Sequence, residues 1–213
     1  TTTVTLGTSG APDRVELGGA PAEPAAFVRA TRFLDHVRRA AGRAESAQVA
    51  SSNSFPTGCG IASSASGFAA LAAAAAGAYG LGADPRELSR LARLGSGSAA
   101  RSLYGGFVEL RPGSRHEESF AEPIAPESAW PDLRDVVLIL SEAEKKVSSA
   151  EGHRFAETSE MFAGRLAAIP ERAARVRRAI LDRDLTALGE ASEADALSML
   201  AVMMTSNPPL FYW

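Results

Sequence analysis

Residues 62–81 constrain the fold most, because all are apolar or small and none is charged. A stretch of about 20 such residues has the length of a membrane span. Most are alanine, glycine or serine, however, and Leu71 is the only strongly hydrophobic aliphatic before Leu81. Alanine is too weakly hydrophobic to drive insertion into a bilayer. The segment also follows a turn-rich loop, so we predict a tightly packed buried helix that ends near Gly80 or Gly82.

Length and composition narrow the class of protein. A chain of 213 residues suits one large domain or two small ones. With 46% hydrophobic and 22% charged residues it is neither disordered nor collagen-like, and a net charge of -3 gives no sign of nucleic-acid or membrane-surface binding. The single cysteine cannot form an intramolecular disulfide, and no secretory signal opens the chain, so we expect a reducing, cytoplasmic location.

The first third of the chain predicts strands and helices in alternation. Residues 2–8 and 14–17 alternate in hydropathy around a turn, which predicts a hairpin. Apolar residues then recur at helical spacing over residues 24–42, with a proline at the start and a glycine at the end. Residues 48–52 predict a short strand that leads into the loop before the alanine-rich helix.

Further along the chain, Asp84 and Glu87 have the spacing of a capping box for a helix over residues 85–94. A Gly-Ser loop and a strand over residues 104–110 follow. We interpret the charged, proline-rich residues 111–132 as a connector between two lobes. The sequence thus predicts an α+β fold with an N-terminal domain over residues 1–128 and a C-terminal domain over residues 129–213.

The C-terminal part predicts one strand followed by helices. Residues 135–141 contain a continuous apolar run of two valines, two leucines and an isoleucine at 136–140, which is typical of a strand covered on both faces. Residues 153–206 predict helices broken at Pro170 and at residues 182–184. Pro208 and Pro209 then end the last helix.

The loop over residues 53–67 is the strongest functional motif. Gly58 and Gly60 allow the backbone N–H groups to turn toward a ligand, and the helix that follows presents unpaired N–H groups and a positive dipole end. Ser63 and Ser64 can add hydroxyls to a phosphate or to its Mg²⁺. The alternative is a Gly/Ser turn that only caps a buried helix. The loop is neither a Walker loop nor a Rossmann fingerprint.

This loop resembles the ATP-phosphate loop of the small-molecule kinases that include galactokinase, homoserine kinase and mevalonate kinase. The matching residues are Pro56, Gly58, Gly60, Ser63 and Ser64, while Ile61 and Ala62 replace a leucine and a glycine of the usual pattern. Ala62, after the string Asn-Ser-Phe-Pro-Thr, is more similar to the mevalonate diphosphate decarboxylases within that superfamily. Three further segments match that branch in order: residues 95–107, residues 145–152 and residues 208–212.

The resemblance implies a two-lobed (GHMP-type) fold, with mixed or antiparallel sheets and packed helices, and a reaction. Members of the family use ATP and Mg²⁺ to phosphorylate the 3-hydroxyl of mevalonate 5-diphosphate. The new phosphate then leaves together with CO₂, which gives an isopentenyl product. The resemblance also implies a small-molecule substrate and a possible homodimer.

The substrate would carry a carboxylate at one end and phosphates at the other. Arg101 is the candidate for the carboxylate, because a guanidinium can bind both oxygens, although a surface arginine at a helix start is the alternative. Ser96 and Ser98 would add hydroxyls beside it. Lys145 and Lys146 are the only lysines in the chain. A solvated charge pair is one interpretation of them; a phosphate site is the other, made of Lys146, Ser148 and Ser149.

The remaining reactive side chains give weaker indications. His153 could approach the site from a helix start, and no His/Cys/Asp spacing predicts zinc. Cys59 is interpreted as a small filler in the loop rather than a nucleophile.

The sequence departs from the family in three ways. It lacks the opening Lys-Tyr-Trp-Gly-Lys-like string, and the catalytic aspartate that the family implies would lie beyond Trp213. We therefore expect a central portion of the enzyme, with no catalytic residue assigned within it. Leu200 stands where relatives commonly have histidine, so decarboxylation of mevalonate 5-phosphate, or a 3-kinase activity, stays open. A truncated, inactive homologue is the non-enzyme alternative.

Overall fold

The computed structural model describes residues 1–55, 63–82, 84–138 and 149–211. The chain divides into two compact units. Residues Thr1–Pro126 make up the body of the first, and the second contains Glu127–Val137 and the helices from Ser149 onward. The α+β class predicted from the sequence is confirmed. The division after residue 128 stays a prediction.

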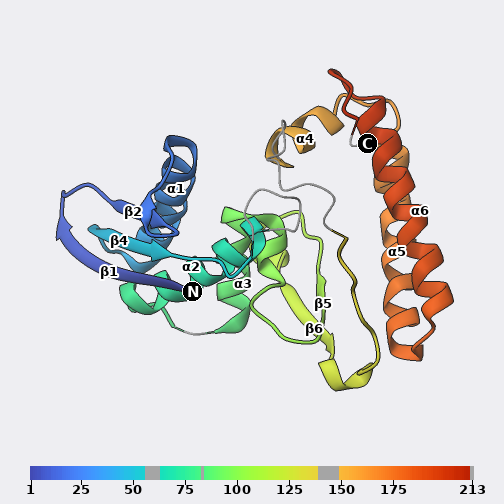
Figure 1. The fold of residues 1–213 in the computed structure, drawn as a ribbon, viewed down its shortest axis with the longest axis horizontal. Coiled ribbons are helices and arrows are strands. Elements are labelled where there is room, and N and C mark those ends of the chain that lie inside the picture. Colours follow the sequence, from blue (N-terminus) through green and yellow to red (C-terminus); the bar gives the residue numbers. More distant parts are fainter. Residues whose placement is uncertain (56–62, 83, 139–148, 212–213) are drawn as a thin grey trace. The chain divides into compact units, whose positions relative to one another are not determined.

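The first unit begins with a four-stranded sheet in the order β1-β4-β2-β3 (Figure 1). Its strands are β1 (Thr2–Ser9), β2 (Arg14–Leu17), β3 (Ala20–Pro21) and β4 (Glu45–Ser51). Strand β4 pairs antiparallel with β1 and parallel with β2, so that Val49 lies opposite both Val4 and Val15. The predicted hairpin between residues 2–8 and 14–17 is therefore wrong, because β4 lies between these two strands.

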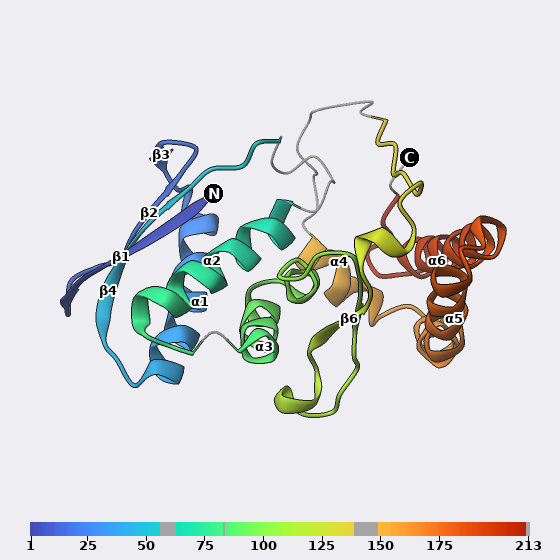
Figure 2. The same ribbon diagram turned by 90° about the horizontal axis from the view of Figure 1, so that it is seen from below.

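Helices α1 (Pro24–Ala41) and α2 (Ser63–Tyr79) pack with this sheet into one core (Figure 2). Phe33, Leu34 and Val37 of α1 are all at most 1% exposed. Helix α1 ends at Gly42, which takes a left-handed φ of 63° that glycine adopts without strain. Both helices were predicted and both are confirmed. Across the described residues, no helix combines the length and the apolarity that crossing a bilayer requires.

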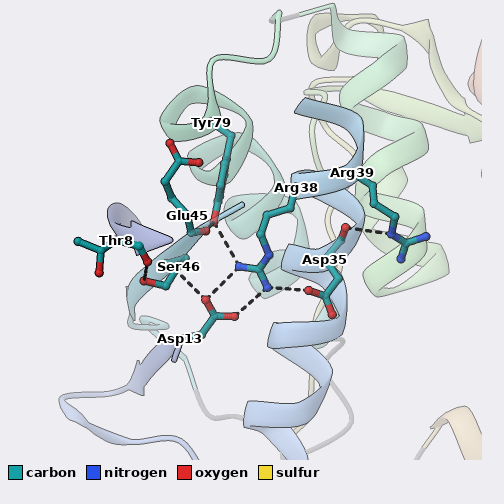
Figure 3. Close-up of polar contacts among 9 residues, drawn as sticks. Thr8, Asp13, Asp35, Arg38, Arg39, Glu45, Ser46 and Tyr79 are labelled. Atoms are coloured by element: carbon teal, nitrogen blue, oxygen red, sulfur yellow. Dashed lines mark hydrogen bonds and ion pairs between the residues drawn. The ribbon is translucent and has the colours of Figure 1, made fainter. Parts of the chain in front are cut away.

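A buried ion pair explains why β2 lies beside β4 and not beside β1 (Figure 3). Asp13, just before β2, has a side chain 4% exposed. Its carboxylate accepts two hydrogen bonds of 3.0 Å from the Arg38 guanidinium and one of 2.8 Å from the backbone N–H of Ala47 in β4. Arg38 also donates to the Tyr79 hydroxyl, which in turn donates to the Glu45 carbonyl at 2.6 Å. These bonds hold the loop after β1 against α1 and β4.

The rest of the first unit contains α3 (Pro85–Gly95), the short helix η1 (Gly97–Ala100), and strands β5 (Phe107–Leu110) and β6 (Ala121–Ala125). Asp84 caps α3 as predicted, accepting from the Arg86 N–H at 2.9 Å, whereas Glu87 forms an ion pair with Arg90. Strand β6 pairs antiparallel with β5 and lies within the predicted connector. The charged residues and prolines of this segment gave no strand pattern in the sequence, and one of these prolines, Pro123, lies within β6.

The second unit is helical, with α4 (Ser149–Ala156), α5 (Phe162–Asp182) and α6 (Leu185–Met204). Helices α5 and α6 lie side by side (Figure 2) and meet at Arg183, which confirms the predicted break at residues 182–184. The predicted break at Pro170 is wrong. Pro170 has no N–H to donate to the Leu166 carbonyl, but both residues are exposed, so the helix can continue here with water in place of that donor.

The apolar run over residues 135–141 is not a strand covered on both faces in its described part. Residues 133–138 carry no strand, and Val136 and Leu138 are 78% and 79% exposed. A strand buried on both faces requires partners on each side, and none of the described strands pairs with this segment. Residues 139–141 lie outside the described residues.

Candidate functional site

Three serine side chains from separate elements meet at the start of α2. The Ser64 Oγ, in the first turn of α2, lies 3.4 Å from the Ser96 Oγ. The Ser96 Oγ lies 3.4 Å from the Ser98 Oγ in η1, and either atom of each pair can donate. A row of three half-buried hydroxyls beside a helix N-terminus can donate hydrogen bonds to phosphate oxygens.

A close contact between α2 and the end of α3 places Ser96 beside Ser64. A Cβ added to Gly95 would lie 2.1 Å from the Cδ1 atom of Phe68, so only glycine allows this approach. The Phe68 ring meets the Phe33 ring edge-on with centroids 5.6 Å apart, and the Arg29 guanidinium lies 5.1 Å above it. Arg29 also donates to the Gly95 carbonyl at 3.4 Å. These contacts fix the residue that precedes Ser96.

Ser96 ends one helix and begins the next. Its extended backbone, with φ of -157°, follows α3 and precedes η1, and its N–H donates to the Ala92 carbonyl at 3.1 Å. This change of direction turns Ser98 back toward Ser96 within two residues. The Gly-Ser loop predicted from the sequence is therefore a helix end followed by a 3₁₀ turn.

Arg101 directly follows η1 and is exposed. Its backbone N–H donates to the Ser98 carbonyl at 3.1 Å, which links it to the three serines. The guanidinium makes no hydrogen bond or ion pair with the described part of the chain. Tyr104, whose N–H donates to the Arg101 carbonyl, has its pKa raised by burial and by the Asp84 carboxylate, so this phenol is neutral near pH 7. Because the Arg101 guanidinium has no partner among the described residues and arginine carries a positive charge, it is available to an anionic ligand.

The described residues contain no group of three or more His, Cys, Asp or Glu side chains that could hold a metal ion. A divalent cation at the serines would therefore take its oxygen ligands from a phosphorylated ligand, from water and from a hydroxyl such as that of Ser64. That donor set suits Mg²⁺, which keeps several waters and is commonly held through substrate phosphates.

The structure places the predicted site residues in three groups. It brings Ser64, Ser96 and Ser98 together, next to Arg101; Ser63 begins α2. Ser149 begins α4 in the second unit, together with the exposed His153. The remaining predicted site residues lie outside the described residues: Pro56, Gly58, Gly60, Ile61, Ala62, Lys146 and Ser148, as does Cys59.

Sequence reasoning missed the residues that hold this site in place. The sequence places Phe68 in an apolar helix, and Gly95 in a Gly-Ser loop at the start of a family-like segment, with no contact predicted between them. The usable signal for Gly95 was its place at the end of a helical pattern, where glycine allows another element to approach closely. The aromatic partner that makes this approach cannot be read from neighbours in sequence.

Comparison with known proteins matches both parts of the chain. Residues 1–121 match the diphosphomevalonate decarboxylase-like N-terminal domain, and residues 135–213 match the mevalonate 5-diphosphate decarboxylase C-terminal domain. The diphosphomevalonate decarboxylase of Aspergillus fumigatus is 46% identical over 169 residues, which cover 78% of this chain and 42% of that protein. That of Bos taurus is 38% identical over 100% of this chain and 56% of its own length.

Solved structures share the fold. The mevalonate diphosphate decarboxylase of Staphylococcus aureus superposes with a TM-score of 0.89 at 36% identity, over 99% of this chain and 64% of that one. A complex described as MDDEF with MVAPP, AMPPCP and magnesium gives a TM-score of 0.89 at 38% identity, over 100% of this chain and 65% of that one. The matches therefore cover between 42% and 65% of the length of these relatives.

Proposed function

The chain belongs to the diphosphomevalonate decarboxylase family, and from this premise we propose that it forms the ATP- and substrate-binding part of such an enzyme. The reaction would convert mevalonate 5-diphosphate and ATP to isopentenyl diphosphate, CO₂, ADP and phosphate, in the mevalonate route to isoprenoids. The observation that carries the proposal is the row of Ser64, Ser96 and Ser98 hydroxyls beside the exposed Arg101.

We assign Ser64 and Ser96 to the phosphoryl groups. The Ser64 hydroxyl lies in the first turn of α2, where helix N–H groups and the dipole favour negative charge. The Ser96 hydroxyl, at hydrogen-bond distance from it, can hold the same anion or orient the Ser64 proton toward it. Bound Mg²⁺ would supply neutralisation of the phosphate charge, with Ser64 as a candidate ligand. AMPPCP and magnesium in the related complex support this assignment.

We assign Arg101 to the carboxylate of the substrate. A planar guanidinium with two parallel N–H donors fits both carboxylate oxygens and fixes their plane. Loss of CO₂ requires the bond to the carboxylate to align with the departing phosphate, so holding the carboxylate in one orientation favours the reaction. The Ser98 carbonyl accepts a hydrogen bond from the Arg101 N–H, and we assign the Ser98 hydroxyl to the same carboxylate. MVAPP in the related complex supports a substrate of this kind.

The decisive experiment uses the complete gene product. It is incubated with ATP, Mg²⁺ and either mevalonate 5-diphosphate or mevalonate 5-phosphate, while ADP and CO₂ are measured together. We expect equal amounts of ADP and CO₂ with the diphosphate. Release of CO₂ only from the monophosphate would show that mevalonate 5-phosphate is the substrate. ADP without CO₂ would indicate a 3-kinase. If neither ADP nor CO₂ is formed, the proposed enzymatic activity is refuted. The homodimer implied by the resemblance and the cytoplasmic location expected from the single cysteine stay predictions.

A further inference from the structure

Ser89 is a buried polar side chain to which neither the sequence motifs nor the site described above assigns a role. It lies in α3, is 0% exposed, and shares the buried face of that helix with Ala92 three residues later. A hydroxyl that is fully removed from water loses free energy unless it is hydrogen-bonded. Ser89 is bonded twice, to partners on two other elements.

The hydroxyl of Ser89 joins η1 to the first residue of β6. Its Oγ donates to the Ala100 carbonyl at 3.1 Å and accepts from the Ala121 N–H at 2.7 Å. Ala100 and Ala121 are themselves 0% exposed, so water cannot replace either bond. Ala121 begins β6, which pairs with β5, so its N–H belongs to a sheet and not to η1. Ser89 therefore connects the β5–β6 sheet to the backbone of η1, which directly precedes Arg101.

The bond to the Ala100 carbonyl bears on Arg101 because the two residues share a peptide group. The Ala100 carbonyl and the Arg101 N–H belong to one planar peptide group. Ser89 holds the carbonyl end of this plane, and the Ser98 carbonyl holds the N–H end at 3.1 Å. Holding both ends of this plane restricts the directions in which the Arg101 side chain can leave the backbone.

We propose that Ser89 is a positioning residue that sets the orientation of Arg101 for carboxylate binding, an inference that rests on the proposed function of Arg101. An arginine that binds a substrate carboxylate from an exposed position receives no alignment from side-chain partners among the described residues. Its alignment must come from the backbone, and Ser89 supplies the buried half of that backbone support. Removing the hydroxyl leaves the Ala100 carbonyl and the Ala121 N–H without their partner, and frees the peptide plane to rotate.

The matched control is Ser46, another buried serine of this unit whose hydroxyl donates to a backbone carbonyl at 3.1 Å. It is 5% exposed and its Oγ donates to the Thr8 carbonyl at 3.1 Å, within the β1–β4 pair. Ser89→Ala and Ser46→Ala therefore remove the same group from similarly buried places. Only the first removes support from Arg101.

The first measurement is a double-mutant cycle on turnover of mevalonate 5-diphosphate by the complete gene product. We expect Ser89→Ala to lower kcat/KM about tenfold in the wild-type background, and to lower it by less than about twofold once Arg101→Ala is present. Ser46→Ala should have the same small effect in both backgrounds. An equal loss from Ser89→Ala with and without Arg101 would overturn the proposal.

The second measurement does not depend on activity and separates this inference from the proposed function. Hydrogen exchange of the Arg101 and Ser102 amides, which bond to Ser98 and Ala99, should accelerate about tenfold or more in Ser89→Ala and stay unchanged in Ser46→Ala. Unchanged exchange at Arg101 would refute the positioning role, even in an active enzyme. Faster exchange in a protein without decarboxylase activity would refute only the proposed function. If Ser89→Ala does not fold, Ser89→Thr keeps the hydroxyl, and wild-type exchange at Arg101 is then expected.

Discussion

At the scale of single residues, the site depends on where backbone groups are held more than on which side chains are charged. Ser96 donates its N–H to α3 and its side chain reaches both Ser64 and Ser98. Arg101 has a long, flexible side chain on a backbone fixed through Ser98. A flexible cation on a rigid base can close around a carboxylate without moving the chain. We therefore expect single substitutions in this site to change catalytic efficiency or stability measurably.

Arg101 provides the most direct test of the carboxylate assignment. A hydrogen bond to a charged group contributes about 1.5–3 kcal/mol, so Arg101→Ala should lower kcat/KM roughly tenfold to a hundredfold. Arg101→Lys should restore little, because an ammonium cannot bind two oxygens in one plane. Steady-state kinetics measures both variants. Arg115→Ala is the control, since the Arg115 side chain is 73% exposed and, among the described residues, forms an ion pair only with Glu118 on the surface. Near-normal efficiency of Arg101→Lys would contradict the assignment.

Gly95 tests the contact that places Ser96. In Gly95→Ala the new Cβ would lie 2.1 Å and 2.5 Å from two Phe68 ring atoms, and that ring is already held against Phe33. We expect a loss of about 1–3 kcal/mol in the free energy of unfolding, measured by urea denaturation. Gly77→Ala is the control. Nothing lies within 4 Å of its added Cβ in the α2 interior, so it should gain up to about 1 kcal/mol. Equal effects at the two glycines would refute the close approach.

At the scale of elements, the two units use ion pairs for different tasks. In the first unit Asp13 and Arg38 fix which strand lies next to β4, through a pair with side chains 4% and 15% exposed. In the second unit Asp195 of α6 accepts two bonds from Arg165 of α5, at 2.8 Å and 3.0 Å, and one from Arg172. This bidentate pair crosses the α5–α6 interface, where few large side chains are fully buried. The helix pair should therefore respond to pH.

Asp195 allows the sign of that response to be predicted. The hydrogen bonds from Arg165, opposed in part by burial, hold the pKa of the Asp195 carboxyl below its ordinary value. A lowered pKa in the folded state contributes stability that is present above the ordinary value of about 3.9 and lost as the pH falls through the folded value. The midpoint temperature of the helical signal should thus fall with decreasing pH below about 4.

The variant Asp195→Asn identifies the group responsible. It should melt at a lower temperature than wild type at pH 7, and the difference should shrink toward pH 2, as followed by circular dichroism at 222 nm in steps of pH. Glu160→Gln removes an exposed acid of the same unit that forms no ion pair with the described residues, and its melting difference should not change with pH. A constant difference for Asp195→Asn across this range would show that the ion pair does not cause the response.

At the scale of the whole molecule, buried apolar surface is concentrated in the first unit. Its core joins the sheet to α1, α2 and α3, whereas the buried cluster of the second unit contains Ala156, Val202, Met203 and Leu210. In residues 136–138 the apolar side chains are exposed. Hydrophobic side chains in that segment should therefore contribute little to the stability of the chain.

A pair of identical substitutions tests this distribution. Val37→Ala removes two methyl groups at 0% exposure and should cost about 2 kcal/mol in the free energy of unfolding. Val136→Ala removes the same groups at 78% exposure and should change that free energy by less than about 0.5 kcal/mol. Chemical denaturation of the 213-residue chain measures both. A loss at Val136 as large as that at Val37 would favour the buried strand predicted from the sequence.

The sequence by itself determined the elements whose ends depend on near neighbours. Helix α1 has its proline at the start and Gly42 at the end, and α3 has Asp84 as its cap, so both could be predicted with their limits. The motif residues Ser64, Ser96 and Arg101 could also be identified as site candidates, because their types and order resemble one family. The helix limits follow from residues within a few positions of one another, and the site candidates follow from short motifs matched in order along the chain.

Only the tertiary structure decided which of these elements meet. The hydrogen bond from Ala47 to Asp13 spans 34 residues, and it places β4 between two strands that alternation alone would have paired. Ser64 and Ser96 are 32 residues apart, and the contact of Phe68 with Gly95 brings them together. Ser89 and Ala121 are likewise 32 apart. Local pattern sets the conformation of a segment, but its partners depend on which distant surfaces fit and bury together, and that information is spread over the whole chain.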